Sequence, residues 1–90
     1  MKLYEAACAA YAPACFNAGS AYLAGEGVPR DPARAGVLYA KACDGGEPRG
    51  CFNLGVLHRR GEGVPKNAAR AAAMFKKACA GGVANACRER

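Results

Sequence analysis

The chain has 90 residues, which is enough for one small domain. Hydrophobic residues make up 52%, but tryptophan is absent and alanine supplies much of that share, so the core must be thin. The net charge is +6, yet the Lys and Arg residues are dispersed in runs of at most two and are not interleaved with aromatic residues. This pattern argues against nucleic-acid binding, and the lack of a long apolar run argues against membrane insertion.

A repeat with a period of 36 residues organises the chain. Residues 16–51 align with residues 52–87 without a gap, and 17 of the 36 positions are identical. A partial copy, residues 1–15, opens the chain. Repeats of this length are typical of solenoids, in which each unit stacks on its neighbours. We therefore predict a single repeat domain over residues 1–90.

The first helix of each unit is predicted from an apolar stripe with the i, i+3, i+4, i+7 spacing of an amphipathic helix. In the two units the stripe residues are Cys15, Ala18, Gly19 and Tyr22, and Cys51, Leu54, Gly55 and His58. A glycine inside a helix costs about 1 kcal/mol relative to alanine, so its recurrence in the stripe predicts that a neighbouring helix approaches closely there. This helix should end at Gly25 in one unit and at Gly61 in the other.

The sequence Gly-Glu-Gly-Val-Pro follows in both units, at residues 25–29 and 61–65. Phosphate-binding loops need a longer glycine pattern after a strand and a Lys-Ser/Thr ending, and nothing in this chain reads as a strand. The segment is therefore predicted to connect two helices. Its first glycine ends the helix with a positive φ, its valine returns to the apolar layer, and its proline stops the helix from continuing.

The second helix of each unit also has an apolar stripe of helical spacing. Its residues are Ala35, Leu38, Tyr39, Ala42 and Cys43 in one unit, and Ala71, Met74, Phe75, Ala78 and Cys79 in the other. Asp31 and Asn67 are predicted to cap the N-termini, with Pro32 at the first helical position. The glycine pairs at 45–46 and 81–82 should end these helices.

Six cysteines occur in the chain, and six allow 15 disulfide connectivities. Zinc binding is disfavoured because the chain has no Cys-x-x-Cys sequence and its only histidine is His58. Disulfides persist in oxidising compartments such as a periplasm or the cell exterior. Met1 to Ala10 lacks the apolar run of a signal peptide, so we expect a fragment or a chain without its leader; free thiols in a reducing cytoplasm are the alternative.

These residues resemble the Sel-1-like repeat family, which is related to the tetratricopeptide repeats. Cys51 to Gly55 and Gly61 to Val64 match the first half of the family pattern, and Lys77-Ala78-Cys79 with Gly82 matches the second half. The resemblance covers nearly the whole chain. It implies an all-α fold: a right-handed α-solenoid, or alpha-alpha superhelix, of antiparallel helix hairpins with 36-residue repeats.

Two alanines of the family pattern are cysteines here, at the end of one helix and the start of the next. This variant is similar to a cysteine-rich bacterial subgroup of secreted proteins, in which a disulfide joins the two helices of a hairpin. By this resemblance, the pairs are Cys8–Cys15, Cys43–Cys51 and Cys79–Cys87. Closing a loop of this size stabilises a fold by about 2.5 kcal/mol in the chain-entropy model.

The resemblance also implies a non-catalytic scaffold that binds a protein or peptide partner on the concave face of the solenoid, without a cofactor or a metal. The candidate contacts are first-helix residues outside the apolar stripe: Asn17, Ser20, Asn53, Val56, Arg59 and Arg60. Neither end carries a polar capping repeat, so further repeats of the same array are an additional candidate partner. A segment that only spaces other parts of a longer protein is a third interpretation.

An enzyme is the alternative function, because some cysteine-rich members of the family are described as β-lactamases or penicillin-binding proteins. Serine β-lactamases need a Ser-x-x-Lys nucleophile and a Lys-Thr-Gly element. The only serine here, Ser20, precedes Ala-Tyr-Leu, and the chain contains no threonine. His58 occupies the repeat position of Tyr22 and is interpreted as a packing residue. We therefore predict no catalytic residues.

Overall fold

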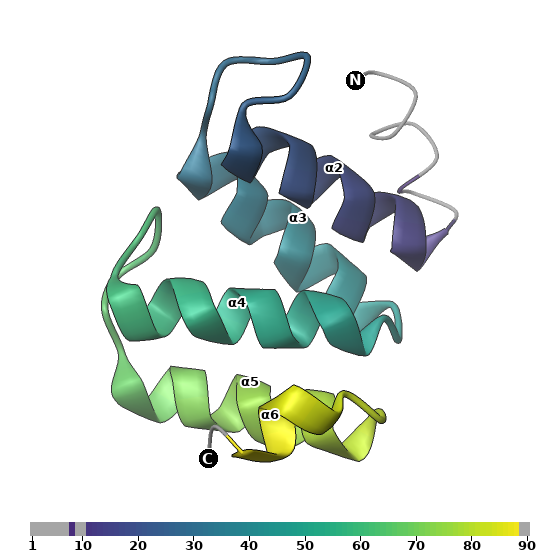
Figure 1. Ribbon diagram of the computed structural model, residues 1–90, viewed down its shortest axis with the longest axis vertical. Helices are drawn as coiled ribbons and strands as arrows, with labels where there is room; N and C mark the ends of the chain where they lie inside the picture. Colours follow the sequence, from purple (N-terminus) through teal and green to yellow (C-terminus); the bar gives the residue numbers. More distant parts are fainter. Residues whose placement is uncertain (1–7, 9–10, 89–90) are drawn as a thin grey trace.

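The computed structural model describes residues 8 and 11–88, and every regular element in this part of the chain is an α-helix. Four helices of 13 residues form two hairpins, and a short helix follows them; the elements are α2 Ala12–Ala24, α3 Pro32–Asp44, α4 Pro48–Arg60, α5 Ala68–Ala80 and α6 Ala84–Arg88. Each helix packs against the next one along the chain, and α2 also contacts α4 (Figure 1). The stack of helix hairpins is the predicted α-solenoid.

The helices begin and end where the residues predict. The side chains of Asp31 and Asn67 each accept a hydrogen bond from the backbone N–H three residues further on, at 3.1 and 2.9 Å. These bonds satisfy donors that have no partner inside the helix. Gly25 and Gly61 end α2 and α4 with φ angles of 75° and 70°, in the left-handed region that only glycine adopts without cost.

The predicted apolar stripes form the core, except that Tyr22 in α2 and two residues of α5 are only half-buried. Tyr39 and Phe75, at equivalent repeat positions, are both 1% exposed. Leu57 lies in a cluster between α3 and α4, so the two hairpins share a continuous core. Met74 and Cys79 also belong to the predicted stripe, but they are only half-buried. We attribute this to α6, which has only five residues in the described part of the chain and covers less of α5 than a full helix would.

In both hairpins a glycine in the first helix makes room for an aromatic ring. A Cβ on Gly19 would lie 2.9 Å from the Tyr39 ring, and a Cβ on Gly55 would lie 2.8 Å from the Phe75 ring. Real Cβ atoms do not approach other atoms so closely. The predicted close approach is therefore present, and it is made by the aromatic side chain of the following helix.

Three disulfides fasten one edge of the solenoid. They join the pairs that the family resemblance implies, with Cα–Cα separations of 4.4, 4.7 and 4.8 Å for Cys8–Cys15, Cys43–Cys51 and Cys79–Cys87. Figure 1 shows the α3–α4 and α5–α6 turns on one side of the stack and the two Gly-Glu-Gly-Val-Pro connectors on the opposite side. The connectors therefore close one end of each hairpin, and at the opposite end Cys43–Cys51 joins α3 to α4 and Cys79–Cys87 joins α5 to α6.

Candidate functional site

The open side of α4 carries four residues at helical spacing that are not fully buried. They are Arg49, Asn53, Val56 and Arg60, and each is exposed or half-buried. The equivalent positions on α2 hold Pro13, Asn17, Ser20 and Ala24, which are also exposed or half-buried. α2 and α4 contact each other, and Arg49 of the α4 stripe reaches Phe16 on α2. We call this surface of eight residues the α2–α4 face.

The six residues predicted to contact a partner fall into two groups. Asn17 and Arg60 are exposed, and Asn53 is half-buried, all on the α2–α4 face. The other three residues of the prediction have contacts inside the protein. Of the six predicted residues, the polar ones that remain available to a partner are therefore Arg60 and the two asparagines, which lie one repeat apart.

The other three predicted residues, Ser20, Val56 and Arg59, make contacts of different kinds. The Ser20 hydroxyl lies 3.0 Å from the Tyr39 hydroxyl and forms a hydrogen bond with it. Val56 packs against the core cluster that contains Phe75. The guanidinium of Arg59 lies 5.3 Å from the centre of the Phe75 ring, so it points toward α5 and away from the open stripe of α4.

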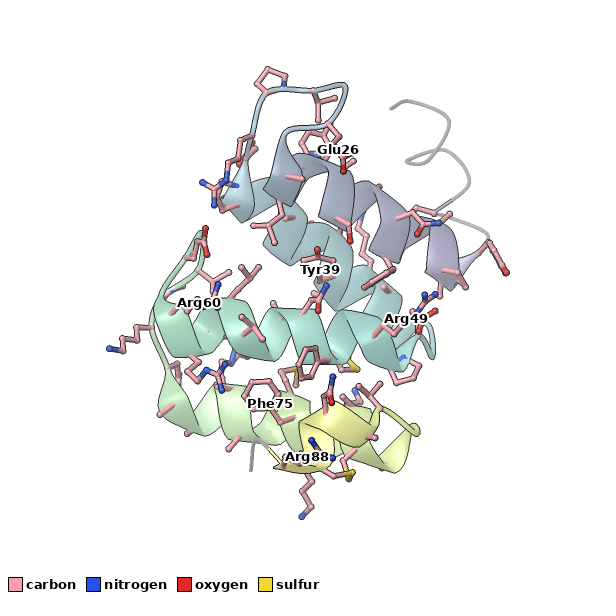
Figure 2. The ribbon with its side chains drawn as sticks, in the orientation of Figure 1. Glu26, Tyr39, Arg49, Arg60, Phe75 and Arg88 are labelled. Atoms are coloured by element: carbon pink, nitrogen blue, oxygen red, sulfur yellow. A yellow bond between two sulfur atoms is a disulfide. The ribbon has the colours of Figure 1, made fainter. Side chains whose placement is uncertain are left out.

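Arg49 is a residue of this face that the sequence analysis did not single out. Its guanidinium lies 4.5 Å from the centre of the Phe16 ring on α2, and it donates a hydrogen bond to Glu47 at 2.7 Å. Figure 2 shows Arg49 and Arg60 at opposite ends of α4. The equivalent of Arg49 in the first unit is Pro13, so comparison of the repeats gives no signal for it.

Glu47 holds Arg49 in place and is itself buried. It caps α4 by accepting a hydrogen bond from the Arg49 backbone N–H at 3.1 Å. The side-chain hydrogen bond from Arg49 lowers the pKa of the Glu47 carboxyl below its usual value, and this effect outweighs the opposing effect of burial. Glu47 is therefore ionised at neutral pH and fixes a cation beside the Phe16 ring.

A hollow of about 320 Å³ opens beside the first stripe. It is lined by Phe16, Asn17, Ser20, Ala21 and Glu26. Two of these residues belong to the predicted partner-binding set, and the lining residues include an aromatic ring, an amide, a hydroxyl and a carboxylate. The hollow has the dimensions and chemistry to receive a side chain of a bound peptide.

The residues that the sequence analysis considered for chemistry all have structural contacts. The buried His58 ring bonds through Nδ1 to the Pro65 carbonyl at 3.1 Å, which ties α4 to the connector after it. All six cysteines form disulfides. In residues 8 and 11–88, no group of three or more His, Cys, Asp or Glu side chains could hold a metal ion. Among the same residues, no helix has the length and apolar character needed to cross a bilayer.

Comparisons with known proteins agree with this architecture. The family model described as Sel1 repeat matches residues 12–47 and 48–83, which is the predicted period in a frame that starts four residues earlier. Three solved structures are similar, each with a TM-score of 0.84 or 0.85. No curated protein matches the chain.

The three structures come from different bacteria. Helicobacter pylori cysteine rich protein B (hcpB) has a TM-score of 0.84 and 35% identity over 88% of this chain and 59% of its own. A Sel1 repeat protein from Oxalobacter formigenes has a TM-score of 0.84 and 31% identity over 87% of this chain and 32% of its own. The Escherichia coli protein c5321, a protective antigen of uropathogenic strains with an SLR fold, has a TM-score of 0.85 and 38% identity over 91% of this chain and 18% of its own.

The chain thus spans only part of the length of these three proteins. The two family matches together cover more than half of it, and the helix boundaries, the period and the disulfides all fit the same repeat. The chain belongs to the Sel1 repeat family.

Proposed function

We propose that this protein is a non-catalytic scaffold that binds a peptide or protein partner on its α2–α4 face, the concave side of the solenoid. The observation that carries the proposal is the recurrence of asparagine at the same position of successive open stripes, Asn17 and Asn53. An amide side chain both donates and accepts hydrogen bonds, so it can pair with the backbone of an extended peptide whatever its sequence. The hollow beside Asn17 adds a place for a side chain.

The surrounding structure is suited to holding such a face rigid. The disulfides, the buried Glu47 and the Arg49 stack on Phe16 all fix the relative positions of α2, α3 and α4. A preorganised surface loses less conformational entropy on binding than a mobile one. In this proposal residues 16–51 and 52–87 are the two full units of a single domain.

We propose an oxidising location, either periplasmic or secreted, for the same protein. Three disulfides are consistent with such a compartment and would not persist in a reducing cytoplasm. Fractionation of the native host, followed by thiol alkylation before and after reduction, tests this. Recovery of the protein in the cytoplasm with alkylated cysteines would overturn it.

The binding proposal is tested by selecting peptides from a random display library on the oxidised chain. Selected peptides should shift the backbone NMR signals of α2 and α4 around Asn17 and Asn53. The double variant N17A/N53A should weaken binding by about tenfold, which corresponds to two lost hydrogen bonds of ordinary strength.

A matched control changes residues on the second helix of each hairpin instead of the first. Val37 and Ala73 are exposed, repeat-equivalent residues of α3 and α5, and V37S/A73S should leave affinity unchanged. Selection of no peptide, or affinity that depends on the control pair alone, would refute the proposal. The same preparation should show no catalytic turnover of a chromogenic β-lactam; sustained turnover would favour the enzyme alternative.

A further inference from the structure

Charge is distributed unequally between the two hairpins. Residues 48–88 contain eight Lys and Arg but a single carboxylate, Glu62. Residues 11–47 contain three Lys and Arg and four carboxylates. Glu62 forms an ion pair with Arg30 of the first hairpin. The second hairpin and α6 together therefore carry a large positive charge, which attracts anions.

Two of these cations lie on the first helices of successive units, α4 and α6. Arg60 ends the open stripe of α4, and Arg88 lies on α6, the helix that follows the second hairpin. Both side chains are exposed (Figure 2). Between the ends of the α4 stripe lie the uncharged Asn53 and Val56. The surface thus combines an amide and an apolar side chain with cations beside them.

We propose that the open stripe of α4, together with α6, binds an acidic peptide, one in which carboxylates alternate with apolar residues. This inference rests on the proposed function and adds the chemical class of the partner. Guanidinium groups form their strongest hydrogen bonds with carboxylates, often two at a time. Arg60 and Arg88 would pair with the acidic residues of the peptide, and Asn53 would bond its backbone.

The same surface is less suited to the other polyanions. Nucleic-acid binding without sequence preference needs exposed rings on which bases stack, but Phe75 is 1% exposed and Phe52 is half-buried against it. Surface binding to a bilayer needs apolar anchors beside the cations. Among the described residues the exposed large apolar side chains are Tyr11 and Val37, and both precede the basic hairpin.

Fluorescence anisotropy tests the inference with a labelled peptide of repeated Glu-Ser-Leu and a neutral peptide in which Gln replaces Glu. The acidic peptide should bind the wild-type protein about tenfold more tightly than the neutral one. The R60Q/R88Q variant should weaken binding of the acidic peptide about tenfold. The matched variant K76Q/K77Q, which removes the same charge from the exposed side of α5, should weaken it by less than about twofold, because salt screens distant charges.

The outcomes separate the two proposals. Equal weakening by both variants would show attraction to net charge alone and would overturn the inference. Binding of the neutral peptide as tightly as the acidic one, with sensitivity to N53A, would overturn the acidic class and keep the proposed function. Binding of neither peptide would count against both. Tighter binding of a single-stranded oligonucleotide or of phosphatidylglycerol vesicles, lost in R60Q/R88Q, would replace the peptide with that partner. Circular dichroism and intact mass verify that each variant is folded and oxidised.

Discussion

At the scale of single residues, the two hairpins solve one packing problem with different chemistry. Ser20 and Tyr39 share a hydrogen bond in the first hairpin, and their repeat equivalents are Val56 and Phe75 in the second. The polar pair and the apolar pair are each self-consistent, because a buried hydroxyl needs a partner and a buried phenyl ring does not. The positions therefore act as a pair.

This pairing predicts a rescue between residues. Tyr39→Phe should lower the free energy of unfolding by about 1 kcal/mol, because the half-buried Ser20 hydroxyl loses its partner. Adding Ser20→Val recreates the pair of the second hairpin and should restore most of the loss. Urea unfolding of the oxidised proteins measures both. The idea fails if the double variant is less stable than Tyr39→Phe alone.

Glu47 predicts how stability depends on pH. Its pKa is lowered in the folded state, mainly by the Arg49 hydrogen bond, so its contribution is present above the pKa of the unfolded chain. The contribution is lost as the pH falls through the lower folded-state pKa. Glu47→Gln should therefore reduce stability at pH 7 and flatten the decline in stability below about pH 4.5.

Thermal unfolding across this range checks the prediction. Glu26→Gln is the matched control, because Glu26 is an exposed carboxylate that caps no helix. An identical pH profile for the wild type and Glu47→Gln would contradict the role assigned to Glu47.

At the scale of elements, the second connector packs against the start of α3 in the first hairpin. Gly63 in the second connector lies directly against the backbone of Pro32 and Ala33 at the start of α3. Val64 reaches Gly36, where a Cβ would lie 2.9 Å from its Cγ1. With the Arg30–Glu62 ion pair, these contacts make the connector an inter-hairpin joint as well as a turn.

Alanine substitutions at two connector glycines measure how much this joint contributes to the free energy of unfolding. Gly27 and Gly63 have φ angles of 78° and 75°, so alanine at either costs about 1–2 kcal/mol in backbone strain. A Cβ on Gly27 would meet nothing within 4 Å, whereas a Cβ on Gly63 would collide with Pro32. Gly63→Ala should therefore destabilise the protein clearly more than Gly27→Ala in urea unfolding. Equal losses would mean that the contact contributes nothing.

The disulfides differ in how far their cysteines are exposed to solvent. Cys79 and Cys87 are half-buried, whereas Cys43 and Cys51 are 5% and 3% exposed. Because thiol–disulfide exchange needs access to sulfur, limited reduction should open Cys79–Cys87 first. Alkylation and peptide mass mapping give the order of reduction. In denaturant, where access is equal, this preference should disappear; if it persists there, exposure is not its cause.

At the scale of the whole molecule, the stability of a solenoid depends on the interface between neighbouring units. Leu57 is 1% exposed and lies in the cluster that joins α3 to α4. Tyr39 of the first hairpin and Leu54 of the second lie in the same cluster, so both hairpins contribute large side chains to the interface. The two hairpins should therefore unfold together.

Leu57→Ala tests this cooperativity. The cavity should cost about 3 kcal/mol, because little of the surrounding structure can collapse into it. Leu23→Ala, a half-buried neighbour of the same cluster, should cost less. Chemical unfolding followed by circular dichroism should show one transition in the wild type. Two separate transitions would show that the hairpins are independent.

Several features of this protein were determined by its sequence alone. The helix caps at Asp31 and Asn67, the glycine stops at Gly25 and Gly61, and the 36-residue period all follow from the chemistry of neighbouring residues. Local geometry of this kind depends on the few residues nearest in the chain, so it can be predicted without knowing the fold. The disulfide pairs followed from the family resemblance, since spacing alone leaves the connectivity open.

Only the tertiary structure decided which side chains meet across helices. Three such contacts join residues that are 19 to 33 positions apart in the chain. They are the Arg49 guanidinium over the Phe16 ring, the hydrogen bond between Ser20 and Tyr39, and the packing of Gly63 against Pro32. These contacts depend on how the helices cross and on the rotamers that the core permits, and neither can be predicted from the local sequence pattern. For the same reason, the charge of the second hairpin can be counted from the residues, but the ion pair of Glu62 with Arg30 cannot be predicted from them.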